Sequence, residues 1–200
     1  TQSDTEVIPA AYDCWGTDCQ LRFNGMWAFA IWDAKERTLF LSRDRFGIKP
    51  LYYTLSRDRF AFASELKAFL HLDGFSPEPC RRVLQRVLTN PFSVEGTEDC
   101  LLSGVKRLAA GSCLLLREDF HAQVTQWWRT WQHLPDVPEC PTEQAERFRE
   151  LFYDSCRLRL RSDVPVATCL SGGLDSSAVL CALAEINQDD AVTERERRAD

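Results

Sequence analysis

Apolar residues in the first third of the chain occur in four short runs that alternate with polar turns. The runs are Gly25–Trp32, Thr38–Ser42, Lys49–Tyr53 and Phe60–Ala63. Runs of this length, rich in aromatic and branched residues and bounded by polar turns, predict β-strands joined in a meander. Because the runs are apolar almost throughout, rather than at every second residue, we expect both faces of the strands to be covered. Trp27, Phe29 and Trp32 are therefore expected in the core.

Helices are predicted around these strands. The sequence Ser3-Asp4-Thr5-Glu6 has the pattern of a capping box, and it predicts a helix from Thr5 to about Trp15 that ends at Gly16. Two further segments, Ser64–Leu70 and Arg81–Thr89, are also expected to be helical. A later pair of apolar runs, Gly111–Leu116 and Ala122–Trp128, predicts two paired strands.

Prolines mark a change of organisation after the second strand pair. The segment 134–141 carries three of them and is predicted to be a linker between domains 1–133 and 142–200. Thr142 is predicted to cap a long amphipathic helix. Its apolar stripe is Ala145, Phe148, Leu151, Phe152 and Leu158.

The segment 164–184 combines an apolar run, a glycine turn and a helical pattern. Val164–Leu170 predicts a buried strand, Ser171-Gly172-Gly173-Leu174-Asp175-Ser176-Ser177 a turn, and Ala178–Ala184 a helix. A strand, a glycine turn and a helix in this order build an anion site in many α/β sheets. Gly172 and Gly173 let the backbone approach a ligand closely. The sequence lacks both the Walker loop and the dinucleotide-binding pattern, so neither of them explains the glycines.

Two residue types in this turn have ordinary structural interpretations as well. Ser176 and Ser177 could cap the helix or donate their hydroxyls to a phosphate. Asp175 could hold a magnesium ion against phosphates, or it could interact only with the helix dipole. The complete string in its strand–helix context favours phosphate binding.

Composition excludes several classes of protein. The chain has 200 residues, 44% of them hydrophobic, which is enough for a packed core. A net charge of −6 argues against a nucleic-acid partner. No apolar stretch approaches the roughly 20 residues that span a membrane, and no signal peptide is visible.

Nine cysteines are scattered along the chain without a C-x-x-C pair, and the three histidines do not lie at zinc-ligand spacing from them. We expect most of the cysteines to be reduced thiols in a cytoplasmic protein.

The string Ser171–Ser177 resembles the pyrophosphate-binding loop of the N-type ATP pyrophosphatases. The resemblance implies ATP and Mg²⁺ as cofactors, with Asp175 as a metal ligand. It assigns ATP binding to these residues: Leu170, Ser171, Gly172, Gly173, Asp175, Ser176 and Ser177.

The first two thirds of the chain resemble the later part of a class II glutamine amidotransferase domain. The blocks that carry this resemblance are residues 3–7, 24–33, 43–53, 63–68 and 104–111, followed by Trp127-Trp128. Together with 162–177, their order is similar to that in the glutamine-hydrolysing asparagine synthetases. The implied fold class is α/β. It comprises an incomplete α+β sandwich of the Ntn-hydrolase type, followed by the start of a parallel-sheet domain like the adenine-nucleotide α-hydrolases. Within the blocks, we interpret Arg43, Asp44, Gly47 and Pro50 as scaffold.

This resemblance implies that ammonia from glutamine amidates aspartate through β-aspartyl-AMP. Asp4 matches the residue that binds the amino group of glutamine, and an interaction with the helix dipole would be compatible with this role. The family's nucleophile is an amino-terminal cysteine, whereas this chain begins with Thr1. No catalytic residue is therefore assigned, and the chain is expected to be an inactive fragment of an enzyme. Glutamine, aspartate and ATP are the implied partners, and a homodimer is left open.

Two alternatives remain at the level of sequence. One is a homologue that adenylates a different carboxylate, such as a β-lactam synthetase-like enzyme. The other is a non-catalytic interaction module, against which the intact phosphate loop argues.

Overall fold

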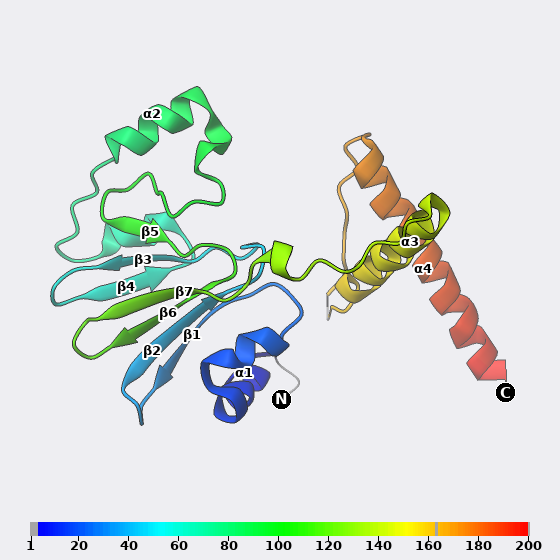
Figure 1. Ribbon diagram of the computed structural model, residues 1–200, viewed down its shortest axis with the longest axis horizontal. Coiled ribbons are helices and arrows are strands. Elements are labelled where there is room, and N and C mark those ends of the chain that lie inside the picture. The colour runs from blue at the N-terminus through cyan, green and yellow to red at the C-terminus, as the bar shows by residue number, and fades with distance from the viewer. Residues whose placement is uncertain (1–3, 163, 200) are drawn as a thin grey trace. The chain divides into compact units, whose positions relative to one another are not determined.

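The computed structural model describes residues 4–162 and 164–199, with the side chains of 5–162 and 164–188. Contacts along the chain divide it between Leu134 and Pro135 into two units, each of which is described by itself (Figure 1). Within the described residues, none of the helices combines the length and the apolar character needed to cross a membrane.

Seven antiparallel strands form two sheets in the first unit (Figure 1). One sheet has the order β1-β2-β6-β7, and the other has the order β4-β3-β5. The strands are β1 (Ala28–Asp33), β2 (Thr38–Arg43), β3 (Tyr52–Leu55), β4 (Phe60–Ala63), β5 (Val105–Arg107), β6 (Ser112–Arg117) and β7 (Ala122–Gln126).

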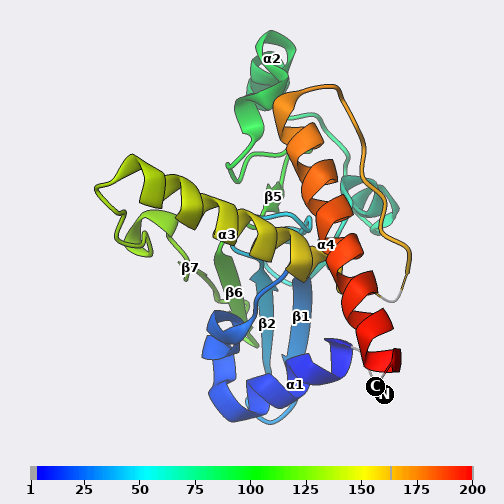
Figure 2. The ribbon, with the colours of Figure 1, turned by 90° about the vertical axis from the view of Figure 1, so that its right-hand side faces the viewer.

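The main core lies between the two sheets. Leu41 and Leu114 from the first sheet pack in one buried cluster with Tyr53 from the second. On its other face the first sheet buries Phe40 and Cys113, which pack with residues of α1 (Asp4–Trp15) and η1 (Gly16–Arg22). Figure 2 shows α1 lying across this sheet. The prediction that both faces of these strands are covered is therefore confirmed for β1 and β2.

A third cluster covers the outer face of the second sheet. Phe69 of η2 (Leu66–His71) packs there with Cys100 and Val105. Burial raises the pKa of the Cys100 thiol to about 11. This layer completes a helix–sheet–sheet–helix order, which agrees with the predicted fold class for the first unit.

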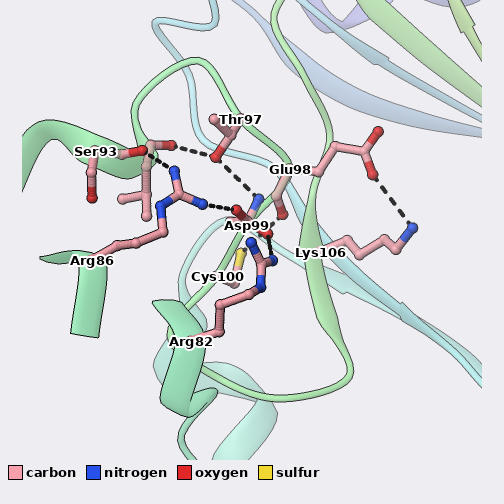
Figure 3. A network of polar contacts seen from close by, with 9 residues as sticks. Arg82, Arg86, Ser93, Thr97, Glu98, Asp99, Cys100 and Lys106 are labelled. Carbon is pink, nitrogen blue, oxygen red and sulfur yellow. Dashed lines mark hydrogen bonds and ion pairs between the residues drawn. The ribbon is translucent and has the colours of Figure 1, made fainter. Parts of the chain in front are cut away.

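Helix α2 (Arg81–Thr89) is tethered to a neighbouring loop by two arginines that share one carboxylate. Arg82 donates to Asp99 at 2.5 Å, and Arg86 donates to the other oxygen of the same carboxylate (Figure 3). Arg86 also donates to the carbonyl of Ser93 in η3 (Pro91–Val94). The hydrogen bond from Arg82, more than any other contact, lowers the pKa of Asp99. Val83, on the inward face of α2, is buried.

Two features of the sheets in the first unit differ from the prediction. The four early strands do not form one meander, because β2 pairs with β6 whereas β3 pairs with β4 and β5. The loop between β2 and β3 transfers the chain from one sheet to the other, and strand propensity carries no information about that step. The three-residue strand β5 was not predicted as a strand, since three residues are too few for a recognisable pattern.

The second unit contains two long helices, α3 (Pro141–Arg159) and α4 (Leu174–Ala199). They pack through Phe152, Tyr153 and Cys156 of α3 and through Ala182 and Ile186 of α4 (Figure 2). The chain reaches this unit through η4 (Thr130–Gln132).

Three predictions for the second unit are wrong. Helix α3 begins one residue before Thr142, at Pro141, where proline is favoured, and its N-cap is Cys140. Phe148 and Leu151, expected on the buried stripe, are 69% and 49% exposed. Residues 164–170 form no strand, because the described part of this unit contains no other strand to pair with their backbone groups.

Candidate functional site

The segment 171–177 is a tight turn that leads directly into α4. Gly172 has a φ of +79°, in the left-handed region where a side chain costs energy. A Cβ atom at Gly172 would meet no other atom within 4 Å. The backbone conformation, and not crowding by the described residues, therefore requires glycine at this position, and the space above it is open.

Serine hydroxyls tie this turn to the first turn of the helix. The Oγ atoms of Ser171 and Ser176 lie 2.9 Å apart, and Ser176 Oγ also accepts from the Ser171 N–H at 3.3 Å. Ser176 and Ser177 both donate to the carbonyl of Gly173, at 3.2 and 2.8 Å. The prediction that these two serines cap the helix is wrong. Both lie inside the helix, which starts at Leu174, and their hydroxyls bond back to a carbonyl as serines in helices often do.

The arrangement is suited to binding an anion. The N–H groups of the first helical turn have no carbonyl partner within the helix, and the helix dipole is positive at this end. Residues 171–175 are exposed, as is Leu170 before them, at 60%, and Ser176 and Ser177 are half-buried. The residues present therefore fit a phosphate group, and their assignment to ATP stays a prediction.

Asp175 lies in the first turn of α4 and is exposed. Among the described residues, no cluster of three or more histidine, cysteine, aspartate or glutamate side chains could hold a metal ion. Asp175 thus fits a magnesium ion only as one protein ligand beside phosphate oxygens, which is how proteins usually bind that ion.

Asp4 is the first residue of α1, and its side chain lies outside the described residues. Its predicted contact with glutamine therefore stays a prediction. The following turn of α1 borders a cleft of about 330 Å³, lined by Val7 and Ile8 of the helix and by 22–27 and Phe29.

The block Arg43–Pro50 is a buried network of side-chain to backbone hydrogen bonds. Asp44 is 1% exposed, and its carboxylate accepts from the N–H groups of Phe46, Ile48 and Lys49 at 3.0–3.1 Å. Arg43 donates to the carbonyls of Gly47, Lys49 and Leu108 at 2.5–2.7 Å. The interpretation of Arg43, Asp44 and Gly47 as scaffold is confirmed.

Aromatic residues near this block have more varied positions than expected. Phe29 packs in the buried cluster against α1, and Trp27 stacks on Trp127 with ring centroids 5.8 Å apart. Trp32 is 58% exposed, so its core assignment is wrong; it lies at the end of β1 beside the turn. Sequence reasoning did not single out Arg45, whose guanidinium lies 4.6 Å from the ring centroid of Trp128. No signal in one sequence reveals such a contact between segments far apart in the chain.

Both the first part and the last part of the chain are similar to known protein families. Residues 147–195, which include the turn, match a family described as asparagine synthase. Two similar proteins of Bacillus subtilis are glutamine-hydrolyzing asparagine synthetases 3 and 1, which are 37% and 34% identical over 88% and 94% of this chain. The amidase chry2 of Gibberella zeae is 35% identical over 88% of this chain.

The chain spans only part of these relatives. It covers 28% and 29% of the two synthetases and 26% of the amidase. Residues 1–128, more than half of the chain, match the family described as glutamine amidotransferase domain. On this match, the chain belongs to the glutamine amidotransferase domain family.

Proposed function

We propose that the full-length protein amidates aspartate to asparagine, with ATP as the energy source and glutamine as the nitrogen donor. The intermediate would be β-aspartyl-AMP. The observation that carries this proposal is the turn 171–177, which joins an open glycine in the left-handed region to the start of a long helix. It lies within the segment that matches asparagine synthase and follows an amidotransferase domain.

The proposal gives each part of the turn a role. Gly172 and Gly173 would let the phosphates of ATP approach the backbone, and Ser171, Ser176 and Ser177 would donate hydroxyls to them. Leu170 would lead the chain into the site, and Asp175 would contribute to Mg²⁺ binding. A free carboxylate has no good leaving group. Adenylation by ATP would give it one, AMP, which ammonia could then displace. The serine hydroxyls now bond to one another and to Gly173, so they would exchange these partners for phosphate oxygens.

For the glutamine half of the reaction, we propose that Asp4 binds the amino group of the substrate. No nucleophile is assigned within this chain, and we expect residues 1–200 alone neither to hydrolyse glutamine nor to make asparagine. All nine cysteines are free thiols, which supports a reducing, cytoplasmic location. The absence of a nucleic-acid partner and the homodimer remain predictions.

Pyrophosphate release by the full-length protein tests the proposal. The assay contains ATP and magnesium, with aspartate and glutamine added separately and together. We expect pyrophosphate release that depends on aspartate, and asparagine only when glutamine is also present. Absence of both ATP binding and turnover would contradict the proposal and leave an interaction module as the better account.

A second acceptor class has one specific observation in its favour. The amidase of Gibberella zeae is as similar to this chain as the two asparagine synthetases are. The same assay separates the two candidates, because turnover with another carboxylate, and none with aspartate, would indicate a different acceptor.

A further inference from the structure

A polar cleft of about 350 Å³ in the first unit contains two guanidinium groups, and among the described residues neither of them forms an ion pair with a carboxylate. Its lining includes Arg43, Gly47, Gly96, Thr97 and Arg107, together with Phe46, Glu95, Ala109 and Ala110. The cleft is formed by the loop after β2, the loop after η3 and the end of β5. Its lining shares no residue with the turn 171–177 or with the cleft beside α1.

Arg107 has hydrogen-bonding capacity that the described residues leave unused. Its Nη1 donates to the carbonyl of Val94 at 3.3 Å, and its guanidinium lies 5.6 Å from the ring centroid of Tyr52. Its Nε atom is buried and has no hydrogen-bond partner within the described residues. A buried unpaired donor in a native protein calls for an explanation, and an unseen ligand is a common one.

Arg43 adds a second positive charge to the cleft. Its described hydrogen bonds are all donated to backbone carbonyl oxygens, those of Gly47, Lys49 and Leu108. Burial lowers the pKa of Arg43 and the charge of Arg107 lowers it further, whereas the charge of Asp44 acts in the opposite direction. Two like charges therefore share one partly buried space, which an anion between them would stabilise.

The acidic residue of the cleft leaves this charge largely uncompensated. Glu95 is exposed, and among the described residues it forms no ion pair with either arginine. Gly96 has a φ of +71°, and a Cβ atom there would meet nothing within 4 Å, so the backbone is accessible on this side.

We propose that this cleft binds a small oxyanion, a carboxylate or phosphate group, through hydrogen bonds from the guanidinium of Arg107. The positive charge of Arg43 would add electrostatic attraction. A guanidinium presents donors in a planar fork that matches either group. The proposal is independent of the function proposed above, since it uses neither the turn 171–177 nor Asp4.

The test is a titration of the full-length protein with inorganic phosphate in one arm and malonate in the other, at constant ionic strength. Binding is followed by calorimetry and by the Nε–H NMR resonance of Arg107. We expect this resonance to shift in the wild-type protein with at least one anion. The arm with the tighter binding identifies the preferred group. A resonance that moves with neither anion would overturn the proposal, whether or not any variant folds.

Three variants make the test specific. Arg107→Met should raise the dissociation constant by about ten-fold or more, because a hydrogen bond to a charged group is lost. Lys106→Gln removes the same charge from the next residue, outside this cleft, and should change the constant by no more than about two-fold. Equal losses in the two variants would contradict the proposal. Ser176→Ala/Ser177→Ala should leave this binding unchanged; if it abolished the binding, the anion would occupy the turn 171–177 instead.

Discussion

Two motifs in this chain combine a glycine in the left-handed region with an aspartate, and their surroundings are opposite. In the block 43–50, the guanidinium of Arg43 lies over Gly47, and Asp44 is buried with three N–H groups on its carboxylate. In the turn 171–177, the space over Gly172 is empty and Asp175 is exposed. The first motif has its hydrogen-bonding partners within the chain, whereas the second has open space beside the N–H groups of a helix start.

This difference separates a structural motif from a candidate binding motif. Removing a side chain from the self-contained motif should mainly reduce stability. Removing one from the open motif should hardly change stability, and under the proposed function it should reduce binding. The predictions below test whether buried and open positions of this chain differ in this way.

The largest contrast is expected between the two aspartates. Asp44→Ala would leave three partly buried N–H groups without their acceptor and should lower the free energy of unfolding by about 2–4 kcal/mol. Asp175→Ala should change it by no more than about 0.5 kcal/mol. Denaturant unfolding of both variants measures the contrast, and Asp44→Asn, which keeps one acceptor oxygen, serves as a milder control. Similar losses for Asp44→Ala and Asp175→Ala would remove the basis of the comparison.

Thiol reactivity extends the comparison to the cysteines. Burial raises the pKa of Cys100 from 9.0 to about 11, which leaves about a hundred-fold less thiolate at neutral pH. The pKa of exposed Cys140 is lowered, first by a hydrogen bond from the backbone of Glu143. Cys140 should therefore react at lower pH than Cys100 with an alkylating reagent, as followed by peptide mass spectrometry. Faster modification of Cys100 in the native protein would show that the third cluster is not packed as described.

The two glycines should differ less than the two aspartates. Alanine at either position costs about 1–2 kcal/mol because of the positive φ. At Gly47 the new Cβ atom would also lie 3.0 Å from Cζ of Arg43, which should add about 1–3 kcal/mol. Thermal unfolding of Gly47→Ala and Gly172→Ala measures the difference. If Gly172→Ala were the less stable variant, the space above Gly172 would not be open.

The smallest effect on stability is expected from the serines of the turn. Their hydroxyls are exposed and bond to groups that water can also satisfy. Ser176→Ala/Ser177→Ala should therefore change the free energy of unfolding by no more than about 0.5 kcal/mol. A much larger loss would show that these hydroxyls serve mainly to hold the helix start together.

Local features of this fold were predictable from the sequence, and the pairing of distant segments was not. The bounds of β4 and α2 coincide with predicted segments, because their apolar patterns are strong and polar turns or prolines flank them. The meander was wrong because pairing depends on which sheet the chain enters after Arg43. The segment 164–170 has the composition of a strand, but composition does not provide a neighbouring strand.

For the candidate sites too, local motifs were predictable from the sequence and contacts between distant segments were not. The sequence identified the turn 171–177 and the scaffold character of Asp44, since both depend on local residue types. The cleft around Arg107 depends on three segments that meet only in the folded chain, so no pattern in one sequence could reveal it.

The most direct test of the central claim is magnesium-ATP binding by the full-length protein, wild type against Ser176→Ala/Ser177→Ala. We predict that the wild-type protein binds and that the variant, with unchanged unfolding, binds at least about ten-fold more weakly. Equal binding by both proteins would contradict the assignment of the turn to the phosphates of ATP.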